Sequence, residues 1–169
     1  MRRKSRKVYP LTSVVHPFPA VYSQESETLI LGSFPSVKSR ENMFYYGHPQ
    51  NRFWRVTAAV FGADVPETID EKKRFIIENR LALWDVIESC EITGSSDASI
   101  KNAVVNNIAG LIAKSKINRV FCNGGTAGKL YERYIYSRTG IAALILPSTS
   151  PANAAYNLER LIDAWKIIK

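Results

Sequence analysis

Short apolar runs alternate along this chain with segments of helical periodicity. The runs cover residues 27–32, 81–87, 118–122 and 141–146, and polar or turn-forming residues separate them. The segments that predict helices cover residues 51–62, 70–80, 100–115, 126–136 and 153–168. Strands that alternate with helices build a parallel sheet covered on both faces. The pattern therefore predicts an α/β fold with three layers, α/β/α, around a central four-stranded, mainly parallel sheet.

The first 24 residues do not follow this pattern. They contain Pro10, Pro17 and Pro19 and predict an irregular, basic N-terminal arm over residues 1–24. The remainder, residues 25–169, has no repeat, low-complexity tract or linker and is predicted to be one domain. With 169 residues, 46% of them hydrophobic, the chain is long enough to bury a single core.

The positive charge is concentrated at the N-terminus. Twenty-three Lys and Arg against 15 Asp and Glu give a net charge of +8, and removing the five basic residues among the first seven leaves +3 for the rest. The five are Arg2, Arg3, Lys4, Arg6 and Lys7. A basic tail binds phosphates without needing structure, but it can also simply be solvated. The charge therefore fits a nucleic-acid partner and leaves the solvated tail open.

Several classes of protein are excluded by composition. Cys90 and Cys122 lie among apolar residues, which predicts buried, reduced thiols, and two cysteines are too few for a four-cysteine iron–sulfur cluster. His16 and His48 are far apart, and no cluster has the spacing of metal ligands, so we expect no metal and no cofactor. No apolar run reaches the length of a membrane span, and no secretory signal is present, which predicts a cytoplasmic protein.

The segments that carry chemistry all follow predicted strands. They cover residues 32–36, 85–97, 123–125 and 147–153. In parallel sheets the ligand site forms at the carboxyl ends of the strands. We therefore expect these four segments to meet in one site.

The first of these segments belongs to a loop rich in flat side chains. It reads Gly32-Ser33-Phe34-Pro35-Ser36 and is followed by Tyr45-Tyr46-Gly47-His48-Pro49-Gln50-Asn51-Arg52-Phe53-Trp54. The second stretch alone has four aromatic rings, an imidazole and amides, which is more than a connecting loop needs. They indicate a pocket for a flat polar ring.

Two other chemistries are rejected. Residues 123–129 have the glycines of a phosphate-binding loop, but Gly124 and Gly128 are one residue too close and Leu130 replaces the Mg²⁺-binding hydroxyl. The glycines are better explained as a turn from strand to helix. Ser33 lacks the Gly-x-Ser-x-Gly elbow and a partner His and acid, so a hydrolase triad is excluded.

The ordered set of motifs resembles the uracil-DNA glycosylase superfamily over roughly residues 25–169. Residues 32–36 are similar to its first motif, Gly-x-x-Pro-Gly, and His48-Pro49-x-Asn51-Arg52-Phe53-Trp54 is similar to the mismatch-specific uracil glycosylases. Leu146-Pro147-Ser148-Thr149-Ser150-Pro151-Ala152-Asn153 lies where the superfamily has its DNA-clamping loop. The sequence Ser-Thr-Ser-Pro-Ala-Asn at residues 148–153, together with Leu83-Trp84-Asp85-Val86 earlier in the chain, most resembles the hypoxanthine-DNA (deoxyinosine) glycosylase branch.

The resemblance implies Asn51 as the catalytic residue. Phe34 occupies the slot where related enzymes place a water-activating Asn or Asp, and a phenyl ring can do neither job. This argues against ordinary uracil excision and leaves Asn51 to orient the water. Asn51 directly precedes a predicted helix, so a role as helix N-cap remains open.

The resemblance also implies residues that bind the base. Tyr46 is expected to stack on the flipped base or to pack in the core. Asp85 is expected to accept the N1 proton of hypoxanthine or to cap the next loop, and His48 is either a structural hydrogen-bonder or a catalytic acid. The full base-binding set is Gly32, Ser33, Phe34, Pro35, Tyr46, His48, Asp85 and Asn123.

Small hydroxyls in both motifs are expected to contact the DNA backbone. This DNA-binding set is Ser36, Ser39, Ser148, Thr149, Ser150, Pro151 and Asn153. The alternative is a Ser/Thr/Pro turn in which Asn153 caps the last helix.

The implied function is that of a monofunctional, monomeric DNA repair glycosylase. It would hydrolyse the N-glycosidic bond of a deaminated base, above all hypoxanthine, flipped out of double-stranded DNA. A uracil or G·U mismatch glycosylase on the same fold is one alternative. A non-catalytic nucleic-acid-binding module is the other, because Phe34 replaces the usual catalytic residue.

Overall fold

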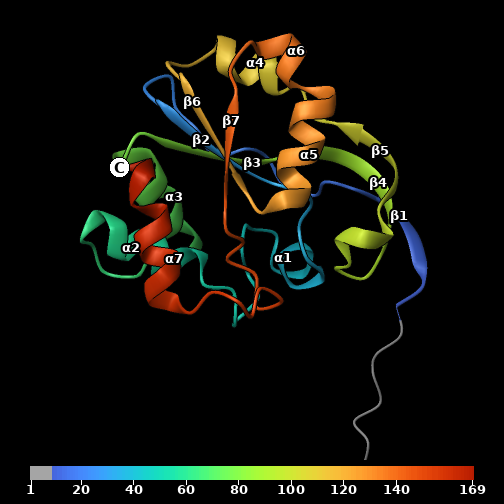
Figure 1. Cartoon of the computed structure of the whole chain (residues 1–169), viewed down its shortest axis with the longest axis horizontal. Helices are drawn as coiled ribbons and strands as arrows, with labels where there is room; N and C mark the ends of the chain where they lie inside the picture. Colours follow the sequence, from blue (N-terminus) through green and yellow to red (C-terminus); the bar gives the residue numbers. More distant parts are fainter. Residues whose placement is uncertain (1–8) are drawn as a thin grey trace, which may run out of the picture.

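Two sheets organise residues 9–169, the part of the chain that the computed structural model describes (Figure 1). The strands are β1 (Leu11–Val15), β2 (Thr28–Gly32), β3 (Leu81–Asp85), β4 (Ile87–Thr93), β5 (Lys101–Val105), β6 (Arg119–Asn123) and β7 (Ala143–Leu146). The α-helices are α1 (Val37–Asn42), α2 (Phe53–Phe61), α3 (Ile69–Glu78), α4 (Ile108–Ala113), α5 (Gly125–Tyr134), α6 (Tyr136–Thr139) and α7 (Leu158–Trp165). Two short 3₁₀ helices, η1 (Asp97–Ser99) and η2 (Lys166–Ile168), complete the set.

The larger sheet is parallel throughout and has the strand order β3-β2-β6-β7. Its register pairs Gly32 with Asp85, and Asn123 with Leu146. The polar residues at the ends of β2, β3 and β6 therefore meet at one edge. The predicted four-stranded parallel sheet is confirmed.

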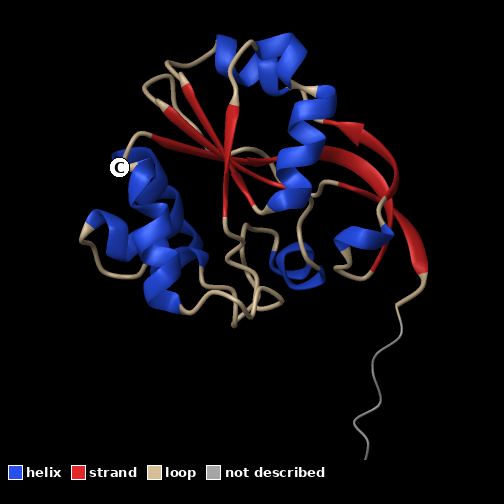
Figure 2. Ribbon diagram, in the orientation of Figure 1, coloured by secondary structure: helices blue, strands red, loops and turns tan. Residues whose placement is uncertain are grey.

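Helices cover both faces of this sheet, as Figure 2 shows. Successive side chains of a strand point to opposite faces, so Ile30 packs with α2, α3 and α7, whereas Leu29 and Leu31 pack with α4 and α5. All five residues of β2 are buried, which explains its unbroken apolar run. This arrangement confirms the three-layer α/β/α fold.

The smaller sheet was not predicted. It is antiparallel, with the order β1-β4-β5, and β1 pairs along its whole length with β4, from Leu11 opposite Thr93 to Val15 opposite Ser89. The prediction of an irregular arm over residues 1–24 is therefore wrong for residues 11–15. Val21 also forms a bridge to Leu83. Prolines flank this short strand and make the segment look irregular. Its hydrogen bonds come from β4, which is distant in the sequence, so no local pattern predicts it.

The prediction of one helix over residues 100–115 is also wrong. Residues 101–105 are strand β5, and α4 begins only after Asn107, whose side chain caps it by accepting from the Gly110 N–H at 3.0 Å. Antiparallel pairing with β4 decides the conformation of Val104 and Val105, which have β-branched side chains. The predicted strand over 81–87 is similarly divided, since β3 ends at Asp85 and β4 begins at Ile87.

The other differences are smaller. Helix α1 falls in a stretch predicted as loop, and the predicted helix 126–136 is observed as α5 followed by α6. The last helix begins at Leu158 rather than at residue 153, because the Asn157 side chain accepts from the Arg160 N–H at 2.9 Å and caps it.

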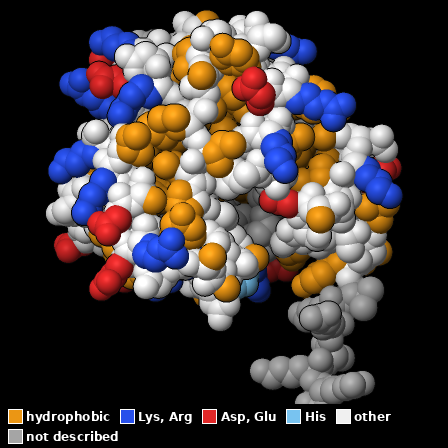
Figure 3. Space-filling view, viewed as in Figure 1, with side chains coloured by type: hydrophobic (Ala, Val, Ile, Leu, Met, Phe, Trp, Pro, Cys, Tyr) orange, Lys and Arg blue, Asp and Glu red, His pale blue; other side chains and the backbone are white. Residues whose placement is uncertain are grey.

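The surface of the described residues has no single dominant charge on the face shown in Figure 3, where basic side chains are dispersed and acidic ones lie among them. The basic cluster at residues 2–7, predicted to bind DNA or to be solvated, lies outside the described residues. Within residues 9–169, no helix combines the length and apolar content that crossing a membrane requires.

Candidate active site

A cavity of about 140 Å³ opens at the carboxyl edge of the parallel sheet. It is smaller than the roughly 300–1,000 Å³ of pockets for drug-sized ligands, which suits a ligand of the size of one base. Thirteen of the predicted site residues line it: Gly32, Ser33, Phe34, Pro35, Ser36, Ser39, Tyr46, Asn51, Asp85, Asn123, Ser148, Thr149 and Ser150. Tyr45, Ser95 and Asp97 also line it. None of them was named as a site residue, although Ser95 and Asp97 belong to the segment 85–97 that was expected there.

The floor of the cavity depends on the absence of a side chain at Gly32. A Cβ built there would lie 2.4 Å from Oδ1 of Asp85 and 3.3 Å from the Tyr46 hydroxyl. Only glycine therefore allows the carboxylate and the phenol to approach the end of β2. This explains on steric grounds why the first motif begins with glycine.

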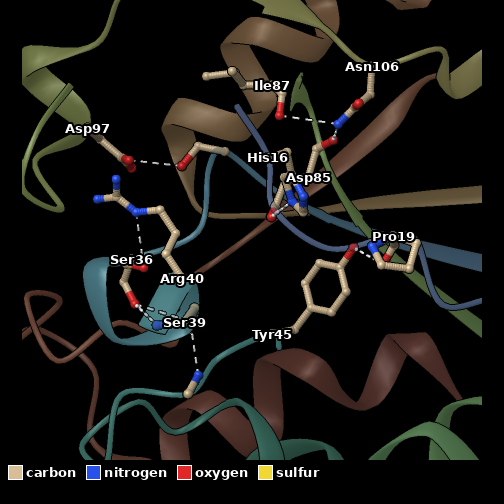
Figure 4. A network of polar contacts seen from close by, with 12 residues as sticks. His16, Pro19, Ser36, Ser39, Arg40, Tyr45, Asp85, Ile87, Asp97 and Asn106 are labelled. Carbon is tan, nitrogen blue, oxygen red and sulfur yellow. Dashed lines mark hydrogen bonds and ion pairs between the residues drawn. The ribbon is translucent and has the colours of Figure 1, made fainter. Parts of the chain in front are cut away.

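Asp85 is not a loop cap. Its side chain is 5% exposed, and Oδ2 lies 2.7 Å from Nε2 of His16, whose side chain is 4% exposed (Figure 4). Asn106 donates to the Asp85 backbone carbonyl at 2.8 Å and so fixes the end of β3. Sequence reasoning missed His16 because it follows directly after β1, a strand that the apolar pattern does not reveal.

The two tyrosines of the aromatic loop have different surroundings. Tyr45 donates from its hydroxyl to the Pro19 carbonyl at 3.0 Å. Tyr46 adopts a left-handed backbone with φ of 54°, and its ring stacks on Phe53 with centroids 4.0 Å apart. Burial, followed by the nearby Asp85 carboxylate, raises the pKa of the Tyr46 hydroxyl, and the Asn123 side chain acts in the opposite direction. Core packing thus occupies one face of the ring and leaves only the other for a base.

Phe34 lines the cavity but belongs to a separate small core. It is 8% exposed and packs with Ile87, Cys90 and Ile92 of β4, with the Arg40 guanidinium 5.7 Å from its ring centroid. Anchoring of this kind makes it a rigid wall.

Asn51 belongs to a chain of hydrogen bonds that joins the two motifs. Its Oδ1 accepts from the Phe53 N–H at 2.9 Å and from the Thr149 hydroxyl at 3.0 Å. Thr149 in turn accepts from Nδ2 of Asn123 at 2.9 Å and donates its N–H to Oδ1 of Asn123 at 3.0 Å. The two donors occupy the lone pairs of the Asn51 oxygen, so only its Nδ2 is left for a substrate or water.

Arg52 holds the second motif in place, a function that sequence reasoning missed. Its side chain donates to the carbonyls of Ser150 at 2.8 Å, Asn153 at 3.0 Å and Thr149 at 3.4 Å, and to that of Tyr156. The backbone N–H of Arg52 donates to Thr149 as well, at 3.1 Å. Four carbonyls converging on one guanidinium give the loop a defined shape.

The serines of the first motif have local hydrogen bonds. Ser36 caps α1 by accepting from the Ser39 N–H at 3.2 Å, and the buried Ser39 hydroxyl accepts from the Gly47 N–H at 3.0 Å. Ser33 donates to Oδ1 of Asp97 at 2.9 Å. Contacts between these hydroxyls and DNA stay predictions.

Asp97 brings a second carboxylate to the cavity and is drawn in Figure 4. Asp97 is exposed at the rim, so water still reaches its carboxylate, and neighbouring protein atoms displace only part of its hydration. This desolvation raises the pKa of Asp97, and the negative charge of Asp85 acts in the same direction, whereas the Ser33 hydrogen bond opposes both.

Three predicted site residues do not line the cavity: His48, Pro151 and Asn153. Nδ1 of His48 accepts from the Gln50 N–H at 3.1 Å, which places this histidine in a local turn. Asn153 does not cap the last helix and instead donates to the Ser148 carbonyl at 3.0 Å within its own loop.

A metal site is absent from the described residues, in which no three His, Cys, Asp or Glu side chains are grouped as ligands. Cys90 and Cys122 are buried and unbridged, and burial raises the pKa of the Cys122 thiol to about 12. Neither thiol is placed to act as a nucleophile in the cavity.

Comparison with known proteins identifies the family. The family model described as the uracil DNA glycosylase superfamily matches residues 19–169. The chain belongs to this superfamily. The match begins after β1, so His16 lies outside the part of the chain that is recognised as a uracil DNA glycosylase superfamily domain.

Individual members of the superfamily align over most of the chain. A protein of Methanosarcina acetivorans named hypoxanthine DNA glycosylase is 37% identical over 153 residues, which is 89% of this chain and 95% of the relative. A protein of the same name from Methanosarcina barkeri is 35% identical over 80% of this chain and 86% of its own length. A solution NMR structure from M. acetivorans, described as a candidate uracil DNA glycosylase, has a TM-score of 0.75, is 32% identical, and covers 89% of this chain and 96% of its own.

Proposed function

We propose that this member of the superfamily is a monofunctional DNA glycosylase that removes hypoxanthine from deoxyinosine in double-stranded DNA. The two Methanosarcina relatives named hypoxanthine DNA glycosylase support the choice of base. We further propose that it acts as a monomer in the cytoplasm, at the nucleoid. One observation carries the proposal: the two sequence motifs, Asn51 and Asp85 line the same base-sized cavity.

The cavity suits a base that has left the duplex. Extrusion costs a few kcal/mol, and least at a mispair such as one containing hypoxanthine. The face of Tyr46 that does not stack on Phe53 and the rigid Phe34 ring bound the space for a purine. Stacking on an aromatic side chain contributes about 1–3 kcal/mol per base, which offsets much of the unstacking.

Hydrolysis places opposite demands on the two sides of the glycosidic bond. Negative charge grows on the departing purine. The Ser33 N–H has no backbone acceptor among the described residues, and Ser33 lines the cavity. This N–H can therefore donate to the purine and stabilise the charge. Positive charge grows on the sugar, which the Asp97 carboxylate at the rim stabilises. A raised pKa also suits Asp97 for accepting a proton from the attacking water.

Asn51 orients that water. Because its Oδ1 already accepts two hydrogen bonds, we assign the contact with water to the Nδ2 group. The alternative of Asn51 as the helix N-cap is wrong, since Arg52 occupies that position; the Asn51 oxygen instead accepts from the N–H of Phe53, the first residue of α2. We assign its amide nitrogen to the reaction. An amide cannot act as a base, so this contribution is positioning.

A paired excision assay tests the function. Duplex oligonucleotides carrying one deoxyinosine or one deoxyuridine are incubated with the protein, and alkali then cleaves the strand at abasic sites. We expect release of hypoxanthine and no strand cleavage before alkali. Excision of uracil alone would assign the uracil alternative, and binding without excision of any base would assign a non-catalytic module.

The role of Asn51 is tested separately. Asn51→Ala should lower the single-turnover rate about 100-fold, the scale of a lost positioning contact, while DNA binding persists. Asn51→Asp keeps an oxygen for the Phe53 N–H and the Thr149 hydroxyl but removes the donor. Full activity of the Asp variant would contradict the assignment to Nδ2.

A further inference from the structure

His16 and Asp85 form a buried pair at the junction of the two sheets. His16 directly follows β1, and its backbone N–H donates to the Glu88 carbonyl of β4 at 2.7 Å, which fixes the start of its side chain. From there Nε2 reaches Oδ2 of Asp85 at 2.7 Å (Figure 4). A contact between the smaller sheet and the end of β3 thus lies at the floor of the cavity.

The surroundings of the imidazole decide which nitrogen carries the proton. The ring of His16 is enclosed by Phe18, Phe34 and Tyr45, with centroids 4.6, 6.0 and 6.0 Å away. Nδ1 is buried and has no hydrogen-bond partner among the described residues. With its single proton on Nδ1, the neutral ring would have an unpaired donor in an aromatic cage, and the lone pair of Nε2 would face a carboxylate oxygen only 2.7 Å away. The proton therefore resides on Nε2 and is donated to Asp85.

This hydrogen bond determines what Asp85 presents to a ligand. An ionised carboxylate has acceptor sites only, and Oδ2 is occupied by His16. Oδ1 accepts no hydrogen bond from the described residues and lies over Gly32, on the cavity side of the pair. The floor of the cavity consequently offers an acceptor, held in one orientation.

An acceptor at this place separates two classes of base. Hypoxanthine and uracil carry a proton on the ring nitrogen of their pairing edge, N1 and N3 respectively, and can donate it. Deamination produces hypoxanthine from adenine and uracil from cytosine. In adenine and cytosine the same ring nitrogen has a lone pair instead of a proton, and this lone pair would be repelled by the carboxylate oxygen. Guanine also has an N1 proton, and its stable pairing with cytosine disfavours its extrusion.

We propose that His16 is a positioning residue that holds the Asp85 carboxylate as a fixed acceptor and thereby makes the cavity select bases with a protonated ring nitrogen over adenine and cytosine. This role rests on the proposed function and adds a residue outside the matched family region. The pairing of β1 with β4 along its whole length fixes the place where His16 leaves the smaller sheet.

A pair of substitutions at position 16 separates the hydrogen bond from the packing. His16→Phe keeps an aromatic ring within the cage but has no donor, whereas His16→Gln places an amide nitrogen near the position of Nε2. We expect His16→Phe to lower hypoxanthine excision at least tenfold and His16→Gln to stay within about threefold of wild type, because a missing partner at a polar reading site is penalised strongly.

A second pair tests the direction of the hydrogen bond. In Asp85→Asn, His16 donates to the amide oxygen and turns Nδ2 into the cavity, where it meets the N1–H of hypoxanthine donor to donor. In His16→Gln combined with Asp85→Asn, the amide introduced at position 16 can reverse and accept from Nδ2, which returns the oxygen to the cavity. We expect the double variant to excise hypoxanthine about tenfold faster than Asp85→Asn alone.

The measurements are single-turnover rates on deoxyinosine duplexes and melting temperatures of each variant. If His16→Phe does not fold, the comparison of Asp85→Asn with the double variant still decides, since both carry Asn at position 85 and a hydrogen-bonding side chain at position 16. Equal rates for these two, or a folded His16→Phe with the wild-type rate, overturn the role of His16. Wild-type protein that releases no base overturns instead the proposed function.

Discussion

The two sheets contribute to the cavity in different ways. The parallel sheet provides Gly32, Asp85 and Asn123 at the ends of strands, and β2 at its centre is buried at every position. In the antiparallel sheet, by contrast, most residues of β1 and β5 are exposed or half-buried, but this sheet delivers His16 and Asp97. The parallel sheet therefore determines where the cavity lies and supplies the Asp85 carboxylate, whereas the antiparallel sheet adds the histidine that bonds to Asp85 and a second carboxylate. Substitutions in the first should have large effects, and those in the second should tune the chemistry.

The largest effect is expected at the end of β2. Gly32→Ala would place a Cβ 2.4 Å from Oδ1 of Asp85, so the carboxylate must move. Since a misplacement of about 1 Å can cost 10²-fold in rate, we expect excision of hypoxanthine to fall about 100-fold.

Gly125→Ala is the matched control for this substitution. A Cβ at the first residue of α5 meets nothing within 4 Å, so activity should be unchanged. Folding is checked by thermal melts of both variants. A folded Gly32→Ala variant with wild-type excision would show that the carboxylate does not need its present place.

The next largest effect concerns the clamp on the second motif. Arg52→Lys keeps the charge but cannot bond four carbonyls at once, and hydrogen bonds to charged groups contribute about 1.5–3 kcal/mol each. We expect a loss of about 2–3 kcal/mol in the free energy of unfolding and faster proteolysis of residues 148–156. Urea titration and limited proteolysis measure both. Arg55→Lys, at an exposed position of the same helix, is the control, and an equal response from both variants would refute the clamp.

A smaller effect is expected from the hydroxyl that joins the two motifs. Thr149→Val has nearly the same shape but removes the contacts to Asn51 and Asn123. Loss of a net hydrogen bond of about 1–1.5 kcal/mol corresponds to roughly a tenfold lower single-turnover rate. Thr149→Ser retains the hydroxyl and should remain within about twofold of wild type. If the two variants react alike, the hydroxyl does not position Asn51.

The smallest expected effect is a change in stability at Asp97, which lies between β4 and β5 of the antiparallel sheet. Desolvation raises the folded-state pKa of Asp97 above its unfolded value, so its ionised form destabilises the fold at neutral pH. Asp97→Asn should therefore raise the melting temperature by about 2 °C or less at neutral pH while lowering excision, a trade-off typical of active-site charges.

The sign of the pH dependence follows from the same shift. As pH falls through the raised pKa, wild-type Asp97 takes up a proton, and the destabilisation caused by its partly desolvated charge disappears. The higher melting temperature of Asp97→Asn should therefore vanish below about pH 3.9, the pKa of Asp in the unfolded chain. Thermal melts across pH, with Asp64→Asn in an exposed loop as control, measure the difference. A stability advantage that persists at low pH would show that ionisation of Asp97 is not its source.

The parallel sheet could be predicted from the sequence, and the antiparallel sheet could not. The runs at Leu29–Leu31 and Val120–Cys122 predicted the parallel sheet because strands buried on both faces are apolar throughout. The strand at residues 101–105 was assigned to a helix, since the short apolar pattern of an exposed antiparallel strand fits either conformation. His16 was missed for this reason, because it is attached to the sheet that local pattern could not reveal. Asp97 was not named as a site residue, although it ends the segment 85–97 that was expected at the site.

The sequence by itself determined the order of strands and helices in the parallel layer, the edge of the sheet where polar residues collect, and thirteen residues of the cavity lining. The first two features depend on local periodicity and on the geometry of parallel strands. The thirteen residues came instead from the resemblance of the motifs to the superfamily. Only the tertiary structure decided that His16 bonds to Asp85, that Asn51 has its oxygen engaged and its nitrogen available, and that Arg52 binds four carbonyls of a loop some 100 residues later. Such contacts join positions far apart in the chain, and no periodicity along the sequence encodes the direction in which a hydrogen bond points.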